Sequence, residues 1–155
     1  MTGKISQAFI YGLMLICFIA LSSYFSGVSI ASDSSKAIDK IAVSASSIGT
    51  GWVLKNSIYV SPQMLGQFEK TFGAKVLYIK NDIFFKNQNR LQINYIEAPD
   101  VTSASTIYQK LISMVGHANA IAQKGTIVIE IITPDVSLKK AIINVLQPDN
   151  VHTNY

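Results

Sequence analysis

The chain has 155 residues, 49% of them hydrophobic, and a formal net charge of +4. This length accommodates one domain, and the apolar content excludes an intrinsically disordered chain. The basic residues are spread singly except for Lys139-Lys140, unlike the concentrated basic stripe of a nucleic-acid binder, so nucleic acid is not an expected partner.

The N-terminal segment is apolar, with no charged residue between Lys4 and Asp33. It is long enough for a membrane-spanning helix, which needs about 20 apolar residues. It also fits a secretory signal, because the small residues Ser29 and Ala31 precede Ser32 as a cleavage site requires. Residues 1–31 are therefore predicted to be an apolar helix, either a signal peptide or a single transmembrane anchor through residues 5–31.

Both alternatives place the rest of the chain outside the cytoplasm, periplasmic or secreted, or tethered to the membrane by one helix. The single cysteine, Cys17, lies inside the apolar segment. The downstream sequence thus excludes a disulfide framework, a thiolate zinc site and a cysteine nucleophile.

Residues 32–50 are small and polar, with Ala37, Ile38 and Ile41 at helical spacing, and are predicted to be a linker or a short amphipathic helix. Gly49-Thr50-Gly51 then interrupts any helix. The compact domain is expected over residues 51–148.

The first elements of this domain are a strand over 52–60 and a well-delimited helix. Ser61-Pro62 begins the helix and Gly73 ends it. An aromatic, β-branched strand is predicted over 75–86, with a bulge or tight turn at Asn81-Asp82. After a polar turn at 87–89, residues 90–96 alternate between polar and apolar, which predicts a hairpin partner.

A second helix is predicted from Asp100 to Gly116. Residues 126–133 are almost continuously apolar, which indicates a central strand. Pro134-Asp135 begins a third helix and Pro148 ends it. A flexible tail is expected at 149–155.

This order of elements predicts an α+β protein. Specifically, it predicts a ferredoxin-like β-α-β-β-α-β sandwich plus a C-terminal helix, with strands one and three central.

The sequence nominates no catalytic residue, metal site or cofactor. His117 and His152 have no second ligand at metal-binding spacing. Glu130 stands alone in an apolar strand; it either faces solvent or pairs with a neighbour among Lys80, Asp82, Arg90 and Glu97, or it lies inward with a perturbed pKa.

The candidate binding residues lie on the predicted sheet and are Tyr78, Arg90, Gln92, Asn94, Tyr95 and Glu130. The leading hypothesis is a non-catalytic extracytoplasmic domain that binds a protein partner or serves as a subunit of an envelope complex. The alternative is a small-ligand-binding domain, or a small enzyme, using the sheet face around Glu130, Tyr78, Tyr95 and Arg90. Partner identity and oligomeric state are left open.

Overall fold

The computed structural model describes residues 36–114 and 119–153. The predicted signal peptide or anchor at residues 1–31 lies outside the described residues, as does His117. Within the described ranges, no helix is both long and apolar enough to cross a membrane.

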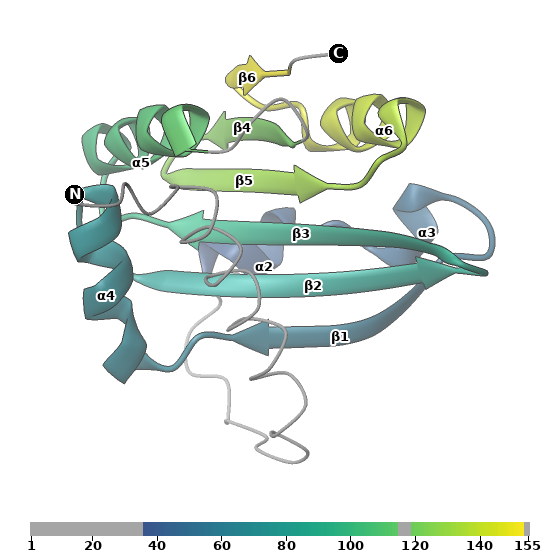
Figure 1. The fold of residues 1–155 in the computed structure, drawn as a ribbon, viewed down its shortest axis with the longest axis horizontal. Helices are drawn as coiled ribbons and strands as arrows, with labels where there is room; N and C mark the ends of the chain where they lie inside the picture. The colour runs from purple at the N-terminus through teal and green to yellow at the C-terminus, as the bar shows by residue number, and fades with distance from the viewer. Residues whose placement is uncertain (1–35, 115–118, 154–155) are drawn as a thin grey trace, which may run out of the picture. The chain divides into compact units, whose positions relative to one another are not determined.

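The domain is built on a six-stranded sheet in which every neighbouring pair is antiparallel (Figure 1). The strands follow one another across the sheet in the order β1-β2-β3-β5-β4-β6. Their bounds are β1 Val53–Tyr59, β2 Tyr78–Lys86, β3 Asn89–Glu97, β4 Ala120–Lys124, β5 Ile127–Ile132 and β6 Asn150–His152. The helices are α2 Ala37–Ile41, α3 Ala45–Ile48, α4 Pro62–Phe72, α5 Val101–Met114 and α6 Val136–Leu146. The predicted α+β class is confirmed.

The described strands do not follow the predicted ferredoxin-like topology. That topology needs β1 at the centre of the sheet, whereas β1 is an edge strand, antiparallel to β2. The reason is that α4 lies beside the end of β1 where β2 begins, so the chain re-enters the sheet next to the strand it left (Figure 1). The next helix, α5, does connect two strands of the same direction, β3 and β4, with β5 between them.

Two strands were not predicted. Residues 120–124 form β4, whose sequence Ala-Ile-Ala-Gln-Lys carries a weak strand signal because alanine and lysine are poor strand formers. Residues 150–152 lie in the predicted flexible tail but form β6, which pairs with β4. As predicted, β5 is a central strand, since β3 and β4 flank it.

The helices cover both faces of the sheet. We call the face packed against α2, α3 and α6 the core face; α2 and α3 lie behind the sheet in Figure 1. The opposite face, which we call the second face, is packed against α5, with α4 beside it. The alternation predicted for β3 is confirmed, because Leu91, Ile93 and Tyr95 are all fully buried on the core face.

Residues 36–48, which we call the strap, belong to the core of the domain. They contain α2 and α3 instead of a linker, and Ile38 and Val43 are 0% and 5% exposed. The hydrophobic core therefore begins well before residue 51.

The bulge or tight turn predicted at Asn81-Asp82 is wrong, because β2 pairs with β3 without interruption from Tyr78 to Lys86. The register shift occurs instead in β1, between Leu54 and Asn56. A bulge with a lysine, Lys55, on an edge strand is a common protection against pairing with another sheet.

Candidate functional site

Six polar side chains form a continuous hydrogen-bonded row on the second face of the sheet. The row crosses β2, β3 and β5 and reaches the residue before β4. We call it the amide strip; its members are Asn81, Arg90, Gln92, Asn94, Asn119 and Glu130.

The strip follows from strand periodicity and from register. Arg90, Gln92 and Asn94 alternate along β3, so their side chains share one face. Antiparallel pairing then sets Asn94 opposite Asn81 on β2 and opposite Glu130 on β5. Side chains at directly paired positions are close enough to interact.

The hydrogen bonds along β3 all point toward the carboxylate. Arg90 Nη2 donates to Gln92 Oε1 over 2.7 Å, and Gln92 Nε2 donates to Asn94 Oδ1 over 3.2 Å. Asn94 Nδ2 then donates to Glu130 Oε2 over 2.7 Å, while Asn119 Nδ2 donates to Glu130 Oε1 over 2.8 Å. Asn81 Nδ2 also donates to Asn94 Oδ1. The hydrogen bonds that start at the Arg90 cation therefore lead to the Glu130 anion.

Glu130 is held by amides instead of by a charged neighbour. Burial raises its pKa above the ordinary value for a carboxyl group, and the hydrogen bonds from Asn94 and Asn119 oppose that rise. The predicted pairing with Lys80 is wrong, because Lys80 lies on the core face, where it contacts Asp39 and Asp82. The alternative, an inward carboxylate with a perturbed pKa, describes Glu130 better.

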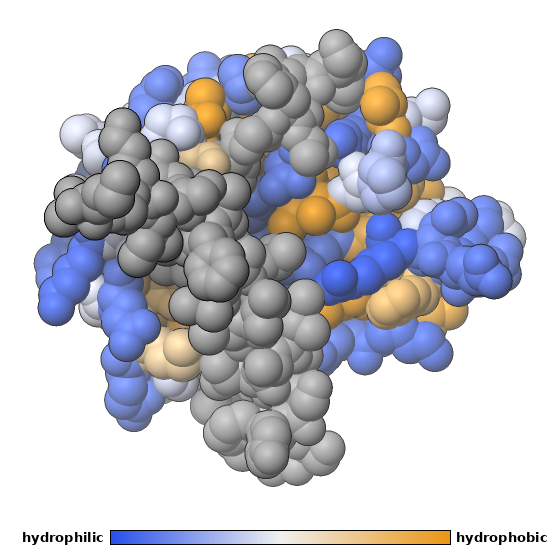
Figure 2. Space-filling view, viewed as in Figure 1, coloured by the Kyte–Doolittle hydropathy of each residue, from blue (hydrophilic) through white to orange (hydrophobic). Residues whose placement is uncertain are grey.

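A cavity of about 290 Å³ lies at the Arg90 end of the strip. It is lined by Arg90, Gln92, Asn119, Ile132, Thr133 and Pro134. Its walls therefore combine hydrogen-bonding groups with two apolar side chains. Figure 2 shows hydrophilic and hydrophobic residues side by side on the visible part of this face.

Two of the six predicted binding residues, Tyr78 and Tyr95, lie on the core face and not on the strip. Tyr95 is fully buried, and its hydroxyl accepts a hydrogen bond from the backbone N–H of Val43 over 3.0 Å. The ring of Tyr78 lies 4.7 Å from the ammonium of Lys36. Tyr95 directly follows Asn94, so strand alternation already places the two residues on opposite faces.

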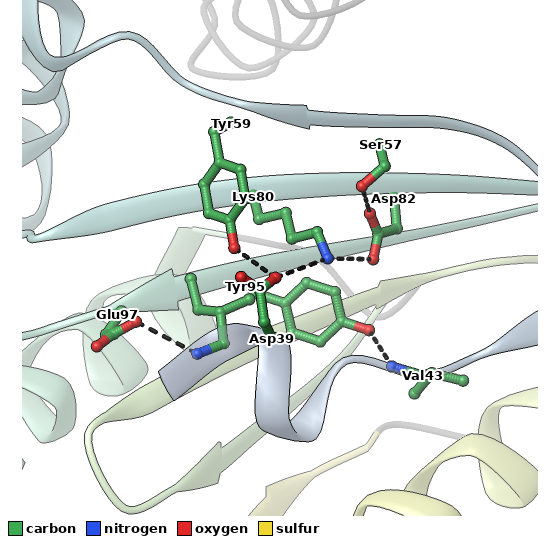
Figure 3. Close-up of polar contacts among 9 residues, drawn as sticks. Asp39, Val43, Ser57, Tyr59, Lys80, Asp82, Tyr95 and Glu97 are labelled. Atoms are coloured by element: carbon green, nitrogen blue, oxygen red, sulfur yellow. Dashed lines mark hydrogen bonds and ion pairs between the residues drawn. The ribbon is translucent and has the colours of Figure 1, made fainter. Parts of the chain in front are cut away.

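A second polar cluster lies on the core face and joins the strap to the sheet (Figure 3). The ammonium of Lys80 lies 3.3 Å from Asp39 Oδ1 in the strap and 3.5 Å from Asp82 Oδ2 in β2. The hydroxyl of Tyr59 donates to Asp39 over 2.7 Å, and that of Ser57 donates to Asp82 over 2.6 Å. Lys80 is thus a cation shared between two carboxylates.

The pKa values in this cluster follow its burial. Burial raises the pKa of Asp82, against the opposing effects of Ser57 and Lys80. Burial also acts to raise the pKa of Asp39, but the hydrogen bonds from Tyr59 and Lys80 outweigh it, so that pKa is lowered. The pKa of Tyr59 is raised by burial and by its bond to Asp39.

Backbone groups of the strap complete this attachment. The N–H of Ile38 donates to Glu97 Oε2 over 3.3 Å, and Val43 donates to Tyr95 as described. The ammonium of Lys36 lies 3.7 Å from the ring centre of Tyr59, a cation–π contact. We interpret this cluster as structural, because its contacts fasten the strap to the sheet and, through Ser57 and Asp82, β1 to β2.

The sequence interpretation missed Asn81 and Asn119 as members of the strip. Asn81 lies at the predicted bulge or tight turn, whereas regular alternation along the strand places its side chain on one face. Asn119 precedes a strand that was not predicted, so nothing in its local sequence connected it with Glu130. Within the described ranges, no group of three or more His, Cys, Asp or Glu side chains is placed to hold a metal ion.

Comparison with known proteins gives no relative from which a role for these residues can be taken: no family model, curated protein or solved structure matches this chain.

Proposed function

We propose that this protein is a non-catalytic extracytoplasmic domain, secreted or membrane-tethered, that binds a small ligand on the amide strip. The observation that carries the proposal is a chain of oriented amides beside a cavity of about 290 Å³. Small-molecule sites are concave and mostly apolar, with a few placed polar groups, and span roughly 300–1,000 Å³. The volume of the cavity is just below the lower limit of that range, which suits a ligand of a few heavy atoms.

The arrangement favours binding over catalysis. Each oxygen of Glu130 accepts a hydrogen bond from an asparagine, so the carboxylate orients the strip. Orientation by neighbouring side chains also lowers the entropy lost when a ligand binds. The extracytoplasmic location rests on the uncharged N-terminal segment between Lys4 and Asp33.

The proposal is tested by screening small molecules for thermal stabilisation of the full-length protein. A ligand at a hundredfold excess over its Kd stabilises the folded state by about 2.7 kcal/mol. Asn94→Ala, which interrupts the strip, should abolish this stabilisation. Asn150→Ala, the same change at an exposed position in β6, should preserve it. Equal stabilisation of both variants would refute the site.

Location is tested separately by intact mass and N-terminal sequencing of the protein from its host. A mature start at Ser32 in the soluble fraction indicates a secreted domain, and an uncleaved chain in the membrane fraction indicates an anchored one. Recovery of an uncleaved chain in the cytoplasm would contradict the proposed location.

Binding of a protein partner is a second proposal, favoured by exposed aliphatic side chains on the edge strand. Val53 and Leu54 in β1 are 50% and 44% exposed. If they contact a partner, cross-linking from a photoreactive residue at position 54 should capture the same protein repeatedly in host membranes. The same residue at position 145, on the exposed side of α6, serves as the control; equal capture from both positions would argue against this surface.

A further inference from the structure

We infer that the cavity at the Arg90 end of the amide strip binds a small carboxylate ligand with an apolar body, and that Arg90 is the residue that recognises the carboxylate. The inference rests on the proposed ligand-binding function and specifies the chemical class of the ligand.

The charge of the cavity wall is the first argument. Among the described residues that line the cavity, one is charged, Arg90. Within residues 36–114 and 119–153, Arg90 forms no ion pair with a carboxylate. The carboxylate of Asp135, next to the lining residue Pro134, instead accepts the N–H of Leu138 over 3.0 Å and caps α6. The wall therefore presents positive charge to a ligand.

The geometry of Arg90 is the second argument. A guanidinium group has five N–H donors in a rigid planar fork that matches a carboxylate. One donor bonds Gln92 Oε1 over 2.7 Å, and this bond orients the group while leaving further donors for a ligand. Gln92 is itself oriented by its bond to Asn94, which is held by Glu130. The hydrogen bonds of the strip thus hold the guanidinium group of Arg90 in place.

The other lining residues supply the rest of the recognition. Two of them, Asn119 and Thr133, carry side chains that can form hydrogen bonds. The Thr133 hydroxyl accepts from the N–H of Asp135 over 3.3 Å, which leaves its own hydrogen to donate. Ile132 and Pro134 form an apolar wall, which suits a hydrocarbon body and disfavours a bare inorganic anion.

The experiment uses the isotope-labelled full-length protein in detergent micelles and follows the side-chain amide resonances of Gln92, Asn94 and Asn119 by NMR. Three probes are titrated separately: 3-methylbutanoate, its neutral isostere 3-methylbutanamide, and inorganic phosphate. We expect the carboxylate to shift these resonances with a Kd on the order of 1 mM, as suits a small fragment. The amide and phosphate should bind much more weakly.

Two variants locate the effect. Arg90→Gln should weaken binding of 3-methylbutanoate by about tenfold to a hundredfold, because charge-assisted hydrogen bonds are lost. Lys86→Gln removes the same charge from the neighbouring strand at a residue outside the cavity lining and should leave the Kd within about twofold, as expected for a screened surface charge. Unchanged backbone resonances away from the cavity confirm that each variant is folded.

The alternative outcomes separate this inference from the proposed function. Equal binding of the neutral amide, or equal weakening by both variants, would overturn the carboxylate assignment while leaving ligand binding at the strip intact. Tighter binding of phosphate would reassign the site to inorganic anions. If no probe shifts the strip resonances, the carboxylate inference is refuted, and the wider ligand screen then decides whether the strip binds a ligand of another class.

Discussion

Ile38 provides a direct measure of how strongly the strap contributes to the fold. Its side chain is 0% exposed and packs in the main hydrophobic cluster. Replacing it with alanine removes apolar volume worth about 0.8 kcal/mol per methylene and leaves a cavity, for a total loss of about 2–5 kcal/mol. The backbone N–H that bonds Glu97 is retained, and alanine is the better helix former, so a loss of stability reports on side-chain packing.

The measurement is urea unfolding of the wild type and of Ile38→Ala, followed by tryptophan fluorescence and circular dichroism. We expect a lower urea midpoint. The slope of the free energy of unfolding against urea concentration should change little, because the unfolded chain exposes nearly the same surface. Ile41→Ala makes the same change at a half-buried position in α2 and should lower the free energy of unfolding by a smaller amount. A loss below about 0.5 kcal/mol for Ile38→Ala would refute our conclusion that the strap is part of the core.

Three further predictions follow from individual contacts. Lys80→Met should destabilise the domain by about 3 kcal/mol in urea unfolding, because the carboxylate of Asp82, which is 2% exposed, loses its cation. Adding Asp82→Asn to the same chain should recover part of this loss. If the double variant recovers no stability, the loss of the ion pair is not the cause. Gly73→Ala should destabilise the domain by about 1 kcal/mol, because residue 73 has a left-handed φ of 72°. Gly66 lies in the interior of α4 with open space around it, so Gly66→Ala should stabilise the domain by a similar amount. If both substitutions changed the free energy of unfolding in the same direction, this account of the helix end would be contradicted. The pKa of Glu130 is raised in the folded protein. Its contribution to stability should therefore be complete at pH values below the ordinary carboxyl pKa. That contribution should fall as the pH rises between the ordinary pKa and the raised one. The unfolding free energy of the wild type minus that of Glu130→Gln should therefore be larger at acidic than at neutral pH, and a flat difference would show that the carboxylate is not desolvated.

Local sequence alone determined most of the individual elements. The start of α4 at Ser61-Pro62 and its end at Gly73 were predictable because those residues favour helix ends through their own backbone geometry. The two faces of β3 were likewise predictable, since alternation of polar and apolar residues needs no knowledge of neighbours. This alternation nominated Arg90, Gln92 and Asn94 as candidate binding residues, and Glu130 was nominated because it stands alone in an apolar strand; all four belong to the amide strip.

Tertiary structure decided which of these elements are neighbours. Asn94 and Glu130 are 36 positions apart, and their contact depends on β3 pairing with β5, which no local pattern encodes. The edge position of β1, the strands β4 and β6 and the burial of the strap share this cause, because each is stabilised by partners remote in the chain. Strand alternation places Tyr78 and Tyr95 on the face opposite the strip, and the order of the strands then decides which of the polar side chains on the second face contact one another.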